Sequence, residues 1–428
     1  MPTDPFRSSE DKLRRDGAAP ALVDAFRRSL QRLLSGETGL IAEASIEPVP
    51  DLPRLSDLAG RAAAGQAALP RTLVIKLNGG LGTGMGLDRA KSLLPVKDGL
   101  TFLDIIARQV LHLRRQYRAP LPVLFMNSFS TERDTLAALA AYPDLAGPAG
   151  LPLSFRQHRV PKLRADTREP VSWPADPEKE WCPPGHGDIY TALVTSGLLR
   201  KLRDAGFRHA FVSNADNLGA TLDLAVLGHF AESGAPFLME VTARTEADRK
   251  GGHLARLPDG RLLLRESAQC PPAEAESFQD IRRHRYFNTN NLWLNLEALD
   301  EHLQRTGGTP DLPVIINRKT VDPRDAASPA VVQLETAMGA ALSVFAGAQA
   351  LDVPRTRFAP VKTTDDLLAL WSDAFVLTED HRLVLHSDRG GLPPVVKLEG
   401  RHYKLWPDFQ SRFPEGAPAL RQCRTLTV

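Results

Sequence analysis

A glycine-rich segment that ends in a lysine is the clearest candidate for chemistry in this chain. Residues 76–91 read KLNGGLGTGMGLDRAK, with five glycines among the eight residues from Gly79 to Gly86 and with Lys91 at the end. Glycines lack the Cβ atoms that would keep a backbone away from a ligand, and they allow positive φ wherever a turn needs it. Backbone amides in such a turn can point at phosphate oxygens, and Lys91 would add a positive charge. The segment therefore predicts a nucleotide-binding loop.

Neither of the two common phosphate-binding patterns fits this segment. A Walker-type loop ends in Gly-Lys-Ser or Gly-Lys-Thr, whereas Ala90 precedes Lys91 here. The dinucleotide pattern needs glycines spaced as G-x-G-x-x-G, and Leu87 stands where the third glycine would be. A flexible surface loop remains the alternative interpretation of the segment taken by itself.

Short apolar runs alternate with helix-like stretches from residue 73 onward, and these elements must position the loop. The expected strands cover residues 73–75, 121–126, 210–212 and 236–239, and the expected helices cover residues 102–117, 189–202 and 222–233. This alternation predicts an α/β domain with a mainly parallel, mixed sheet. Ligands of such sheets bind beyond the carboxyl ends of the strands. The glycine loop follows the first expected strand, and Asn214 and Asp216 follow the third, so informative residues fall where a ligand should bind.

The two ends of the chain depart from this pattern. Apolar residues within 12–34 recur at close to helical spacing, which predicts an amphipathic N-terminal helical element, and the proline-rich residues 46–53 indicate an extended connection. Beyond about residue 370 the helical pattern weakens, which predicts a small, mostly β C-terminal domain. Its expected strands are residues 375–377, 383–385 and 395–398. The chain is thus divided into residues 1–70, 71–370 and 371–428.

The composition excludes several classes of function. Lysine and arginine number 53 and aspartate and glutamate 51, so a net charge of +2 offers no overall field for nucleic acid or an anionic membrane. The three cysteines are far apart, which supports neither a disulfide framework nor a zinc site. The N-terminus has charges where a signal peptide needs apolar residues, and no apolar run reaches the roughly 18 residues of a membrane span. We expect a cytoplasmic protein without nucleic-acid or membrane partners.

Motifs along nearly the whole chain carry a resemblance to a known family. They are GETGLI at 36–41, KLNGGLGTGMG at 76–86, MNSFST at 126–131, PPGHGDIY at 183–190, FVSNADNLGAT at 211–221, MEVTARTEADRKGG at 239–252, FNTNNLW at 287–293, QLETAMGAA at 333–341 and VPRTRFAPVKTTDDLL at 353–368. In this order they resemble the eukaryotic-type UTP–glucose-1-phosphate uridylyltransferases, also called UDP-glucose pyrophosphorylases. The resemblance implies a Rossmann-like nucleotidyltransferase domain followed by a truncated left-handed β-helix. It also implies synthesis of UDP-glucose from UTP and glucose 1-phosphate, with Mg²⁺ as cofactor.

Uridylyl transfer asks little covalent chemistry of a protein. An oxygen of the sugar phosphate attacks the α-phosphorus while pyrophosphate leaves in line, so the protein must position reactants and neutralise charge. The second pKa of a phosphate monoester lies near about 6, so the attacking oxygen is largely ionised at neutral pH and needs no strong general base. Asp216 is the expected magnesium ligand, because Mg²⁺ takes one or two carboxylates together with phosphate oxygens and water. The alternative role for Asp216 is the N-cap of a helix over residues 218–227.

Two lysines are implied by the resemblance to be catalytic. Lys91 is expected to contact the UTP phosphates, although a lone lysine is more often a solvated surface residue. Lys362, in PVKTT, is expected to stabilise charge at the α-phosphate and the sugar phosphate. Its alternative role is to precede a helix that begins near Thr364. A cation is unfavourable at that end of a helix dipole, which favours a phosphate bound nearby.

The resemblance also assigns nucleotide- and sugar-binding residues. His186 is expected to face the sugar phosphate, where flanking glycines would let the backbone approach a ligand; the alternatives are a structural role and general-base catalysis. Gln157 is expected to read the uracil imide edge, because an amide offers both a donor and an acceptor. The other expected nucleotide-binding residues are Leu77, Asn78, Gly79, Gly80, Gly185, Asn214 and Asp216. The other expected sugar-binding residues are Asn288, Thr289, Asn290, Gly252 and Glu240, of which Glu240 is nearly as well explained as a buried ion-paired carboxylate.

The loop before Lys91 departs from the usual sequence of the family at two positions, and two alternative functions remain. Arg89 and Ala90 stand where the family usually has Gly-Pro, so the loop geometry is expected to differ. A related pyrophosphorylase that uses N-acetylhexosamine or several sugar 1-phosphates is the nearest alternative function. The second alternative is a non-catalytic UDP-sugar-binding regulator, which would be expected to lack Asp216, Lys91 or Lys362, and all three are present. The sequence sets no oligomeric state.

Overall fold

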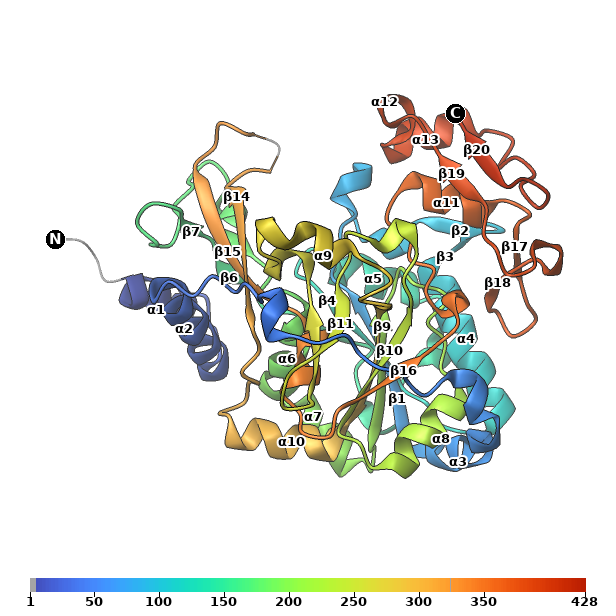
Figure 1. Cartoon of the computed structure of the whole chain (residues 1–428), viewed down its shortest axis with the longest axis horizontal. Helices are drawn as coiled ribbons and strands as arrows, with labels where there is room; N and C mark the ends of the chain where they lie inside the picture. The colour runs from blue at the N-terminus through green and yellow to red at the C-terminus, as the bar shows by residue number, and fades with distance from the viewer. Residues whose placement is uncertain (1–4, 324) are drawn as a thin grey trace. The chain divides into compact units, whose positions relative to one another are not determined.

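The structure is a computed structural model that describes residues 5–323 and 325–428 (Figure 1). These residues form two compact units, each assembled from several segments of the chain. Unit 1 comprises Met1–Pro53, Gln157–Arg208 and Gly234–Asp352, and unit 2 comprises Arg54–Arg156, His209–Ser233 and Val353–Val428. The predicted division of the chain at residues 70 and 370 stays a prediction. Among the described residues, no helix combines the length and the apolar character that crossing a membrane requires.

Unit 2 is built on four parallel strands in the order β9, β1, β4, β5. Their bounds are His209–Asn214, Thr72–Asn78, Val123–Asn127 and Ser154–Arg156. In register, Leu77 of β1 lies opposite Met126 of β4 and Asn214 of β9, so these strands end at nearly the same level. The three longer strands are almost wholly buried, as expected for a parallel sheet covered on both faces. The α/β class and the parallel pairing are therefore confirmed in this unit.

The helices of unit 2 begin and end where local sequence signals place them. Helix α4, Phe102–Tyr117, starts with a capping box between Thr101 and Asp104 and ends where Arg118 takes a left-handed φ of 49°. These bounds equal the predicted ones. The other helices beside the sheet are α3 Ala62–Ala68, α5 Glu132–Leu139 and α8 Leu224–Ser233, and a hairpin is formed by β2 Pro95–Lys97 and β3 Leu100–Thr101.

Unit 1 contains a mixed sheet in the order β12, β11, β13, β10, β16. Their bounds are Leu262–Arg265, His253–Arg256, Tyr286–Asn295, Phe237–Ala243 and Gln349–Asp352. Only β10 and β16 run parallel; the other neighbours are antiparallel. The pairing of β10 with β13 shifts register between Glu240 and Val241, so Thr289 and Asn290 bulge out of the ladder. Helix α10, Leu296–Arg305, and the short helix α9, Ala275–Gln279, adjoin this sheet.

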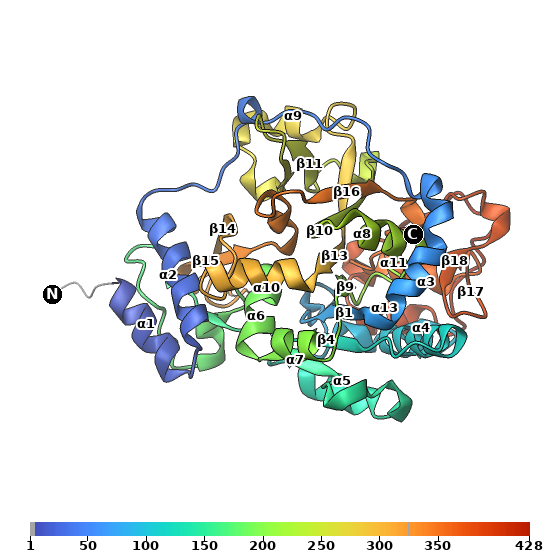
Figure 2. The same ribbon diagram turned by 90° about the horizontal axis from the view of Figure 1, so that it is seen from below.

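A second layer of unit 1 joins the N-terminal helices to a β-hairpin. Strands β14 Val314–Thr320 and β15 Ala330–Thr336 pair along their whole length, and β7 Leu163–Arg164 adds to β15 (Figure 1). Helices α1 Pro5–Arg15 and α2 Pro20–Leu34 lie side by side (Figure 2) and bury their apolar faces with this layer. A short pair, β6 Val160–Pro161 with β8 Trp181–Cys182, packs into the same core.

Two predicted helices are each divided in two. The N-terminal element is two helices because Gly17 takes a φ of 78°, which a continuous helix does not allow. The predicted helix over 189–202 is likewise α6 Ile189–Thr195 and α7 Leu198–Asp204, separated by Gly197 with a φ of 71°. A helix-compatible apolar pattern continues across both breaks, so hydrophobic spacing alone does not reveal them.

The C-terminal segment contains the three predicted strands, a helix that begins at Thr364 as expected, and a further strand and two helices that were not predicted. The strands are β17 Phe375–Leu377, β18 Leu383–Leu385, β19 Val395–Lys397 and β20 Thr425–Thr427, and the helices are α11 Thr364–Trp371, α12 Gly400–Tyr403 and α13 Trp406–Arg412. Strands β17 and β18 form an antiparallel hairpin, while β19 and β20 pair in parallel. The prediction of a mostly β segment is too narrow, because an aromatic cluster of Trp371, Trp406 and Phe409 stabilises helices here.

Candidate functional site

Lys91, Asp216 and the Val361–Lys362 segment come together in unit 2. The Lys91 ammonium lies 2.8 Å from Asp216 Oδ2 and also donates to the carbonyl oxygen of Val361. The amide of Val361 in turn donates to the carbonyl oxygen of Asp216 at 3.1 Å. The side chains of Lys91 and Asp216 are 14% and 27% exposed, so Lys91 is not a solvated surface lysine. Residues more than 120 positions apart in sequence thus share one site at the end of the parallel strands.

The glycine loop lies between β1 and Lys91, and its glycines are of two kinds. Gly82 and Gly86 have positive φ values of 69° and 73°, which explains a glycine at each without any ligand. At Gly80 and Gly84 the φ is not positive and an added Cβ would meet nothing within 4 Å. The protein's own packing therefore does not require glycine there, and a ligand that approaches the backbone would. The loop closes through a hydrogen bond of 3.2 Å from the Lys91 amide to the Gly80 carbonyl.

The start of the loop is held by buried polar contacts. The side-chain amide of Asn78 donates to Asn127 Oδ1 and to Thr135 Oγ1, both at 2.8 Å. The Asn78 carbonyl accepts from the Thr131 hydroxyl at 2.8 Å, and the Leu77 carbonyl accepts from the Ala215 amide at 3.0 Å. The Asn78 side chain thus fixes the backbone that carries Gly79 and Gly80 instead of pointing outward itself.

Asp216 does not cap a helix. Helix α8 begins at Leu224, and the carboxylate that accepts from its first amides, those of Ala225 and Val226, belongs to Asp223. Asn217 holds the Asp216 turn in place: its Oδ1 accepts from the Ala359 amide at 2.9 Å and its Nδ2 donates to the Arg357 carbonyl at 3.1 Å. Sequence reasoning gave Asn217 no role, and the structure shows it tying the Asp216 turn to the segment before Lys362.

Lys362 precedes helix α11 with an exposed side chain. Asp366 Oδ2 accepts from the backbone amides of Lys362 and Thr363 at 2.7 and 2.9 Å, and Thr363 completes a capping box. The start of α11 is therefore satisfied by its own carboxylate, and a phosphate bound near this helix stays a prediction. What places Lys362 in the site is its neighbour Val361, whose carbonyl contacts Lys91.

His186 occupies a turn in unit 1 between Pro184 and helix α6. Its Nδ1 accepts a hydrogen bond of 2.9 Å from the Met338 amide, which leaves the proton of the neutral ring on Nε2. Burial lowers the pKa of His186 to about 4, because desolvation disfavours the charged imidazolium. At neutral pH this geometry presents a neutral N–H donor and not a base of suitable strength.

The glycines beside His186 have a packing reason that the sequence does not reveal. An added Cβ at Gly185, whose φ is 84°, would lie 2.3 Å from the Thr336 carbonyl oxygen, and one at Gly187 would lie 2.4 Å from Thr336 Oγ1. These glycines let the turn approach β15, and the expected approach of a ligand to their backbone stays a prediction. Gln157 adjoins this turn: its Nε2 donates to the Gly185 carbonyl at 3.1 Å.

Asn288, Thr289 and Asn290 lie at the bulge of β13. The Asn288 and Asn290 side chains bond to each other at 2.9 Å, and Asn290 takes a positive φ of 57°. Glu240, fully buried on β10, accepts from Asn291 and from the Trp293 indole, both at 3.0 Å, one on each carboxylate oxygen. These partners are neutral donors. The predicted contact of Glu240 with the sugar stays a prediction. Both carboxylate oxygens already accept hydrogen bonds from the protein.

Packing also explains Gly252, and a missed segment links the predicted residues. An added Cβ at Gly252 would lie 2.5 Å from the Glu266 carboxylate.

The Met338 amide binds His186 while its carbonyl accepts from the Tyr190 hydroxyl at 2.7 Å. A Cβ on the next residue, Gly339, would lie 3.4 Å from Asn288 Nδ2. The AMGAA motif therefore connects His186 to Asn288, which its small residues could have suggested.

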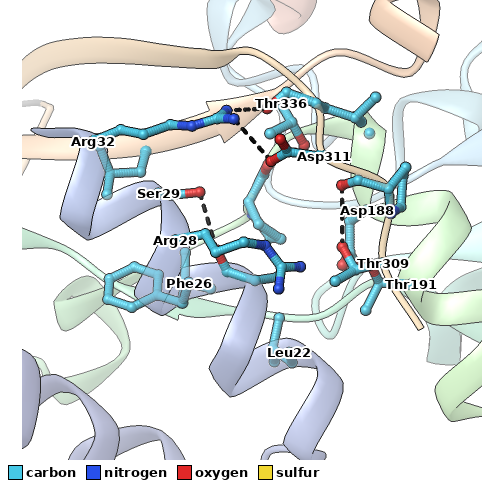
Figure 3. A pocket seen from close by; sticks show the side chains of 17 residues that line it. Leu22, Phe26, Arg28, Ser29, Arg32, Asp188, Thr191, Thr309, Asp311 and Thr336 are labelled. Carbon is cyan, nitrogen blue, oxygen red and sulfur yellow. Dashed lines mark hydrogen bonds and ion pairs between the residues drawn. The ribbon is translucent and has the colours of Figure 1, made fainter. Parts of the chain in front are cut away.

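A cavity behind the His186 turn is too small to be the nucleotide site. It measures about 50 Å³ and lies between α2 and the segments around Asp188 and Asp311 (Figure 3). From α2, Arg32 donates to Asp311 Oδ1 and to the Leu312 carbonyl, each at 2.8 Å. Helix α2 thus supports the turn from the side of this cavity.

The residues present fit a metal ion that is held partly by a substrate. The described part of the chain contains no group of three or more His, Cys, Asp and Glu side chains arranged to hold a metal. Asp216 offers a single, partly exposed carboxylate beside a lysine and a glycine loop. Mg²⁺ is commonly held by one or two carboxylates, with phosphate oxygens and water completing its shell. The donor set therefore suits magnesium bound together with a polyphosphate.

Known proteins of one family match nearly the whole chain. The family model described as UTP–glucose-1-phosphate uridylyltransferase matches residues 23–428. The UTP–glucose-1-phosphate uridylyltransferase of Saccharomyces cerevisiae is 44% identical over 361 residues, which are 84% of this chain and 70% of the yeast protein. The protein of the same name from Encephalitozoon cuniculi is 36% identical over 427 residues, covering 99% of this chain and 83% of that protein.

Solved structures agree with the sequence relatives. A mutant of the UDP-glucose pyrophosphorylase of Leishmania major, in complex with UDP-glucose, is 48% identical with a TM-score of 0.93, covering 100% of this chain and 91% of that one. The UDP-glucose phosphorylase of Trypanosoma brucei is 48% identical with a TM-score of 0.91, covering 99% and 91%.

Proposed function

Because this chain belongs to the UTP–glucose-1-phosphate uridylyltransferase family, we propose that it makes UDP-glucose and pyrophosphate from UTP and glucose 1-phosphate. The observation that supports this most directly is the meeting of Lys91, Asp216 and the Val361–Lys362 segment beside the glycine loop. Cations, one carboxylate and open backbone amides at one place suit a nucleotide triphosphate and its metal.

The reaction is a single displacement at phosphorus. A phosphate oxygen of glucose 1-phosphate forms a bond to the α-phosphorus of UTP, the bond from that phosphorus to the bridging oxygen breaks, and pyrophosphate leaves with its electron pair. Lys91 and Lys362 stabilise the charge that builds on the phosphates, while the amides around Gly80 and Gly84 hold the chain of phosphates in place. Asp216 would hold Mg²⁺, which would supply further neutralisation of phosphate charge when bound.

The residues of unit 1 bind uracil, the sugar phosphate and the sugar. Gln157 reads uracil, with Gly185 in a supporting contact. In unit 2, the backbone of Leu77 to Gly80 and Asn214 serve nucleotide binding. His186 donates its Nε2 proton to the sugar phosphate, since its Nδ1 is already occupied. Asn288, Thr289, Asn290, Gly252 and Glu240 line the place of the glucose hydroxyls, for which uncharged donors and acceptors are suited.

Two further proposals concern the C-terminal fold and the location of the protein. The parallel pairing of β19 with β20 is the kind that a coil of a left-handed β-helix would use, and it supports the proposal of a truncated β-helix at the C-terminal end. A cytoplasmic location is proposed because the three cysteines are free, as is usual in a reducing compartment. UTP, glucose 1-phosphate and Mg²⁺ are the proposed partners.

A substrate panel tests the activity and its alternatives. Pyrophosphate release is measured with UTP and Mg²⁺ in the presence of glucose, galactose or N-acetylglucosamine 1-phosphate. Glucose 1-phosphate should give the highest kcat/KM; a preference for the N-acetylated sugar would identify the related pyrophosphorylase instead. Lys362→Ala should lose turnover far more than UTP binding, whereas a non-catalytic UDP-sugar-binding protein would show no turnover before the change.

A further inference from the structure

A half-buried histidine and a buried aspartate join the two segments of unit 1 that carry Gln157 and His186. His158 directly follows Gln157, and Asp188 lies two residues after His186. The backbone amide of His158 donates to Asp188 Oδ2 at 2.7 Å, and the His158 ring Nδ1 lies 2.8 Å from Asp188 Oδ1. One carboxylate therefore holds both the main chain and the side chain of His158.

The surroundings of this pair allow one arrangement. The side chains of His158 and Asp188 are 18% and 2% exposed. A carboxylate only accepts, so Nδ1 carries the proton in their contact. The other ring nitrogen, Nε2, lies 2.9 Å from the Thr195 hydroxyl on α6, the helix that starts directly after Asp188. Because every unmade bond here would leave a desolvated polar group, the network favours a single orientation of both segments.

We propose that His158 and Asp188 are positioning residues that set the place of Gln157 relative to His186 for uridylyl transfer. Gln157 Nε2 also donates to the Gly185 carbonyl. The same two segments are therefore joined by two contacts, one from Gln157 to Gly185 and one from His158 to Asp188. Neither member of the pair has to contact a substrate for this role. The inference rests on the roles proposed above for Gln157 and His186.

The space behind the turn explains why such a tie matters. The cavity of about 50 Å³ is lined by Asp188 and Thr191 on one side and by α2 on the other, and the Arg28 side chain points into it (Figure 3). Because the turn lines this cavity, it can shift toward the cavity when the contact of Asp188 with His158 is lost. Removing the pair should therefore move His186 away from its place instead of leaving it unchanged.

Three substitutions of His158 separate the two ring contacts. An asparagine amide nitrogen can reach the place of Nδ1 and keep the bond to Asp188, whereas a glutamine amide reaches the place of Nε2 and keeps only the bond to Thr195. We expect His158→Gln and His158→Ala to raise KM for both UTP and glucose 1-phosphate by about tenfold, the loss of a hydrogen bond to a charged group, with a smaller change in kcat. His158→Asn should stay within about twofold of the parent.

Independent measurements keep the result interpretable. The dissociation constant of UDP-glucose, measured by calorimetry without turnover, should rise with His158→Gln and not with His158→Asn. Leu303→Ala, which empties a buried site on α10 of the same unit, serves as a control that lowers the melting temperature and leaves both KM values unchanged. The double variant His158→Gln/Asp188→Asn should be no worse than the poorer single variant, as expected for partners of one interaction.

The outcomes also separate this proposal from the proposed function. If the parent makes UDP-glucose and the Gln and Asn variants have equal KM values, the positioning role is wrong and the activity stands. If His158→Ala does not fold, the comparison of Gln with Asn still decides. A parent that releases no pyrophosphate from UTP and glucose 1-phosphate overturns the proposed function and this inference with it.

Discussion

The residues of unit 2 that are proposed to face phosphates and the residues of unit 1 that are proposed to face uracil and sugar are held by different kinds of contact. In unit 2, the ion pair of Lys91 with Asp216 is partly exposed. In unit 1, His186 accepts from a backbone amide and has its pKa lowered to about 4, and the buried Glu240 accepts from the neutral side chains of Asn291 and Trp293. The proposed phosphate site thus relies on a partly exposed ion pair, and the proposed recognition residues rely on hydrogen bonds to neutral groups.

This difference has an energetic consequence. A partly exposed ion pair contributes little net stability, so Lys91 can exchange Asp216 for a phosphate, and Asp216 can exchange Lys91 for a metal ion, at small cost. The buried contacts of Glu240 cannot be exchanged without leaving desolvated groups unpaired. Unit 2 is therefore suited to rearrange when substrates bind, and unit 1 to stay as it is.

The largest effect should come from Lys91→Ala. The substitution removes a cation from the phosphates and leaves Asp216 without this partner, so kcat/KM for UTP should fall by about 10³-fold. Stability should change by less than about 1 kcal/mol, because the lost pair is partly exposed. Steady-state kinetics and urea denaturation measure the two quantities. Lys201→Ala, at an exposed site on α7, is the matched control, and a similar loss there would refute the assignment.

A smaller loss is expected for Asp216→Asn, which keeps the shape of the side chain and removes its charge. Turnover with Mg²⁺ should fall by about 10²-fold. Paramagnetic resonance of Mn²⁺ added with UTP gives a readout that does not depend on turnover, and less bound Mn²⁺ should be seen than with the parent. Asp223→Ala, at the N-cap of α8, should lower stability without changing Mn²⁺ binding. Unchanged Mn²⁺ binding in Asp216→Asn would show that Asp216 is not a metal ligand.

Part of the pH dependence of unit 1 should come from His186. Its folded pKa of about 4 lies below the ordinary value of 6.5, so its contribution to stability is complete above pH 6.5 and is lost as the pH falls from 6.5 to 4. That contribution should amount to about 2 kcal/mol, since partial exposure reduces the full linkage effect. Denaturant unfolding at pH 7, 5.5 and 4.5 measures it. In His186→Asn the acid loss should be smaller by this amount, while the loss from His253, whose pKa is lowered to about 3, should remain; identical pH curves would contradict a neutral imidazole at His186.

The sequence predicts the parallel-strand part of unit 2 better than it predicts unit 1 or the C-terminal segment of unit 2. Helix α4 is given by its capping box and its apolar spacing, and strands β1, β4 and β9 by short apolar runs, because these signals are local. The breaks at Gly17 and Gly197 and the helices near Trp406 depend on backbone angles and aromatic packing that spacing does not encode.

For the site, residue chemistry indicates which groups matter but not what each one touches. The close approach of Lys91 to Asp216 follows from their places after neighbouring strands. The roles of Asn217, Met338 and Thr336 arise from contacts between segments that are 100 or more positions apart, and no local pattern announces them. The glycines beside His186 show the same limit, because their reason lies on β15.

The smallest effects should distinguish a phosphate loop from a merely flexible turn. Gly80→Ala and Gly84→Ala add a methyl group that meets nothing in the protein, so unfolding free energy should change by less than about 1 kcal/mol, and in the stabilising direction where alanine restricts the unfolded chain. If the neighbouring amides hold phosphates, KM for UTP should still rise severalfold, because the methyl groups occupy the ligand's side of the loop. Gly82→Ala is the contrasting variant: its φ of 69° and the Leu87 and Lys91 side chains oppose any Cβ, so stability should fall as well. Unchanged UTP kinetics in the first two variants would leave the loop as a turn whose only task is to deliver Lys91.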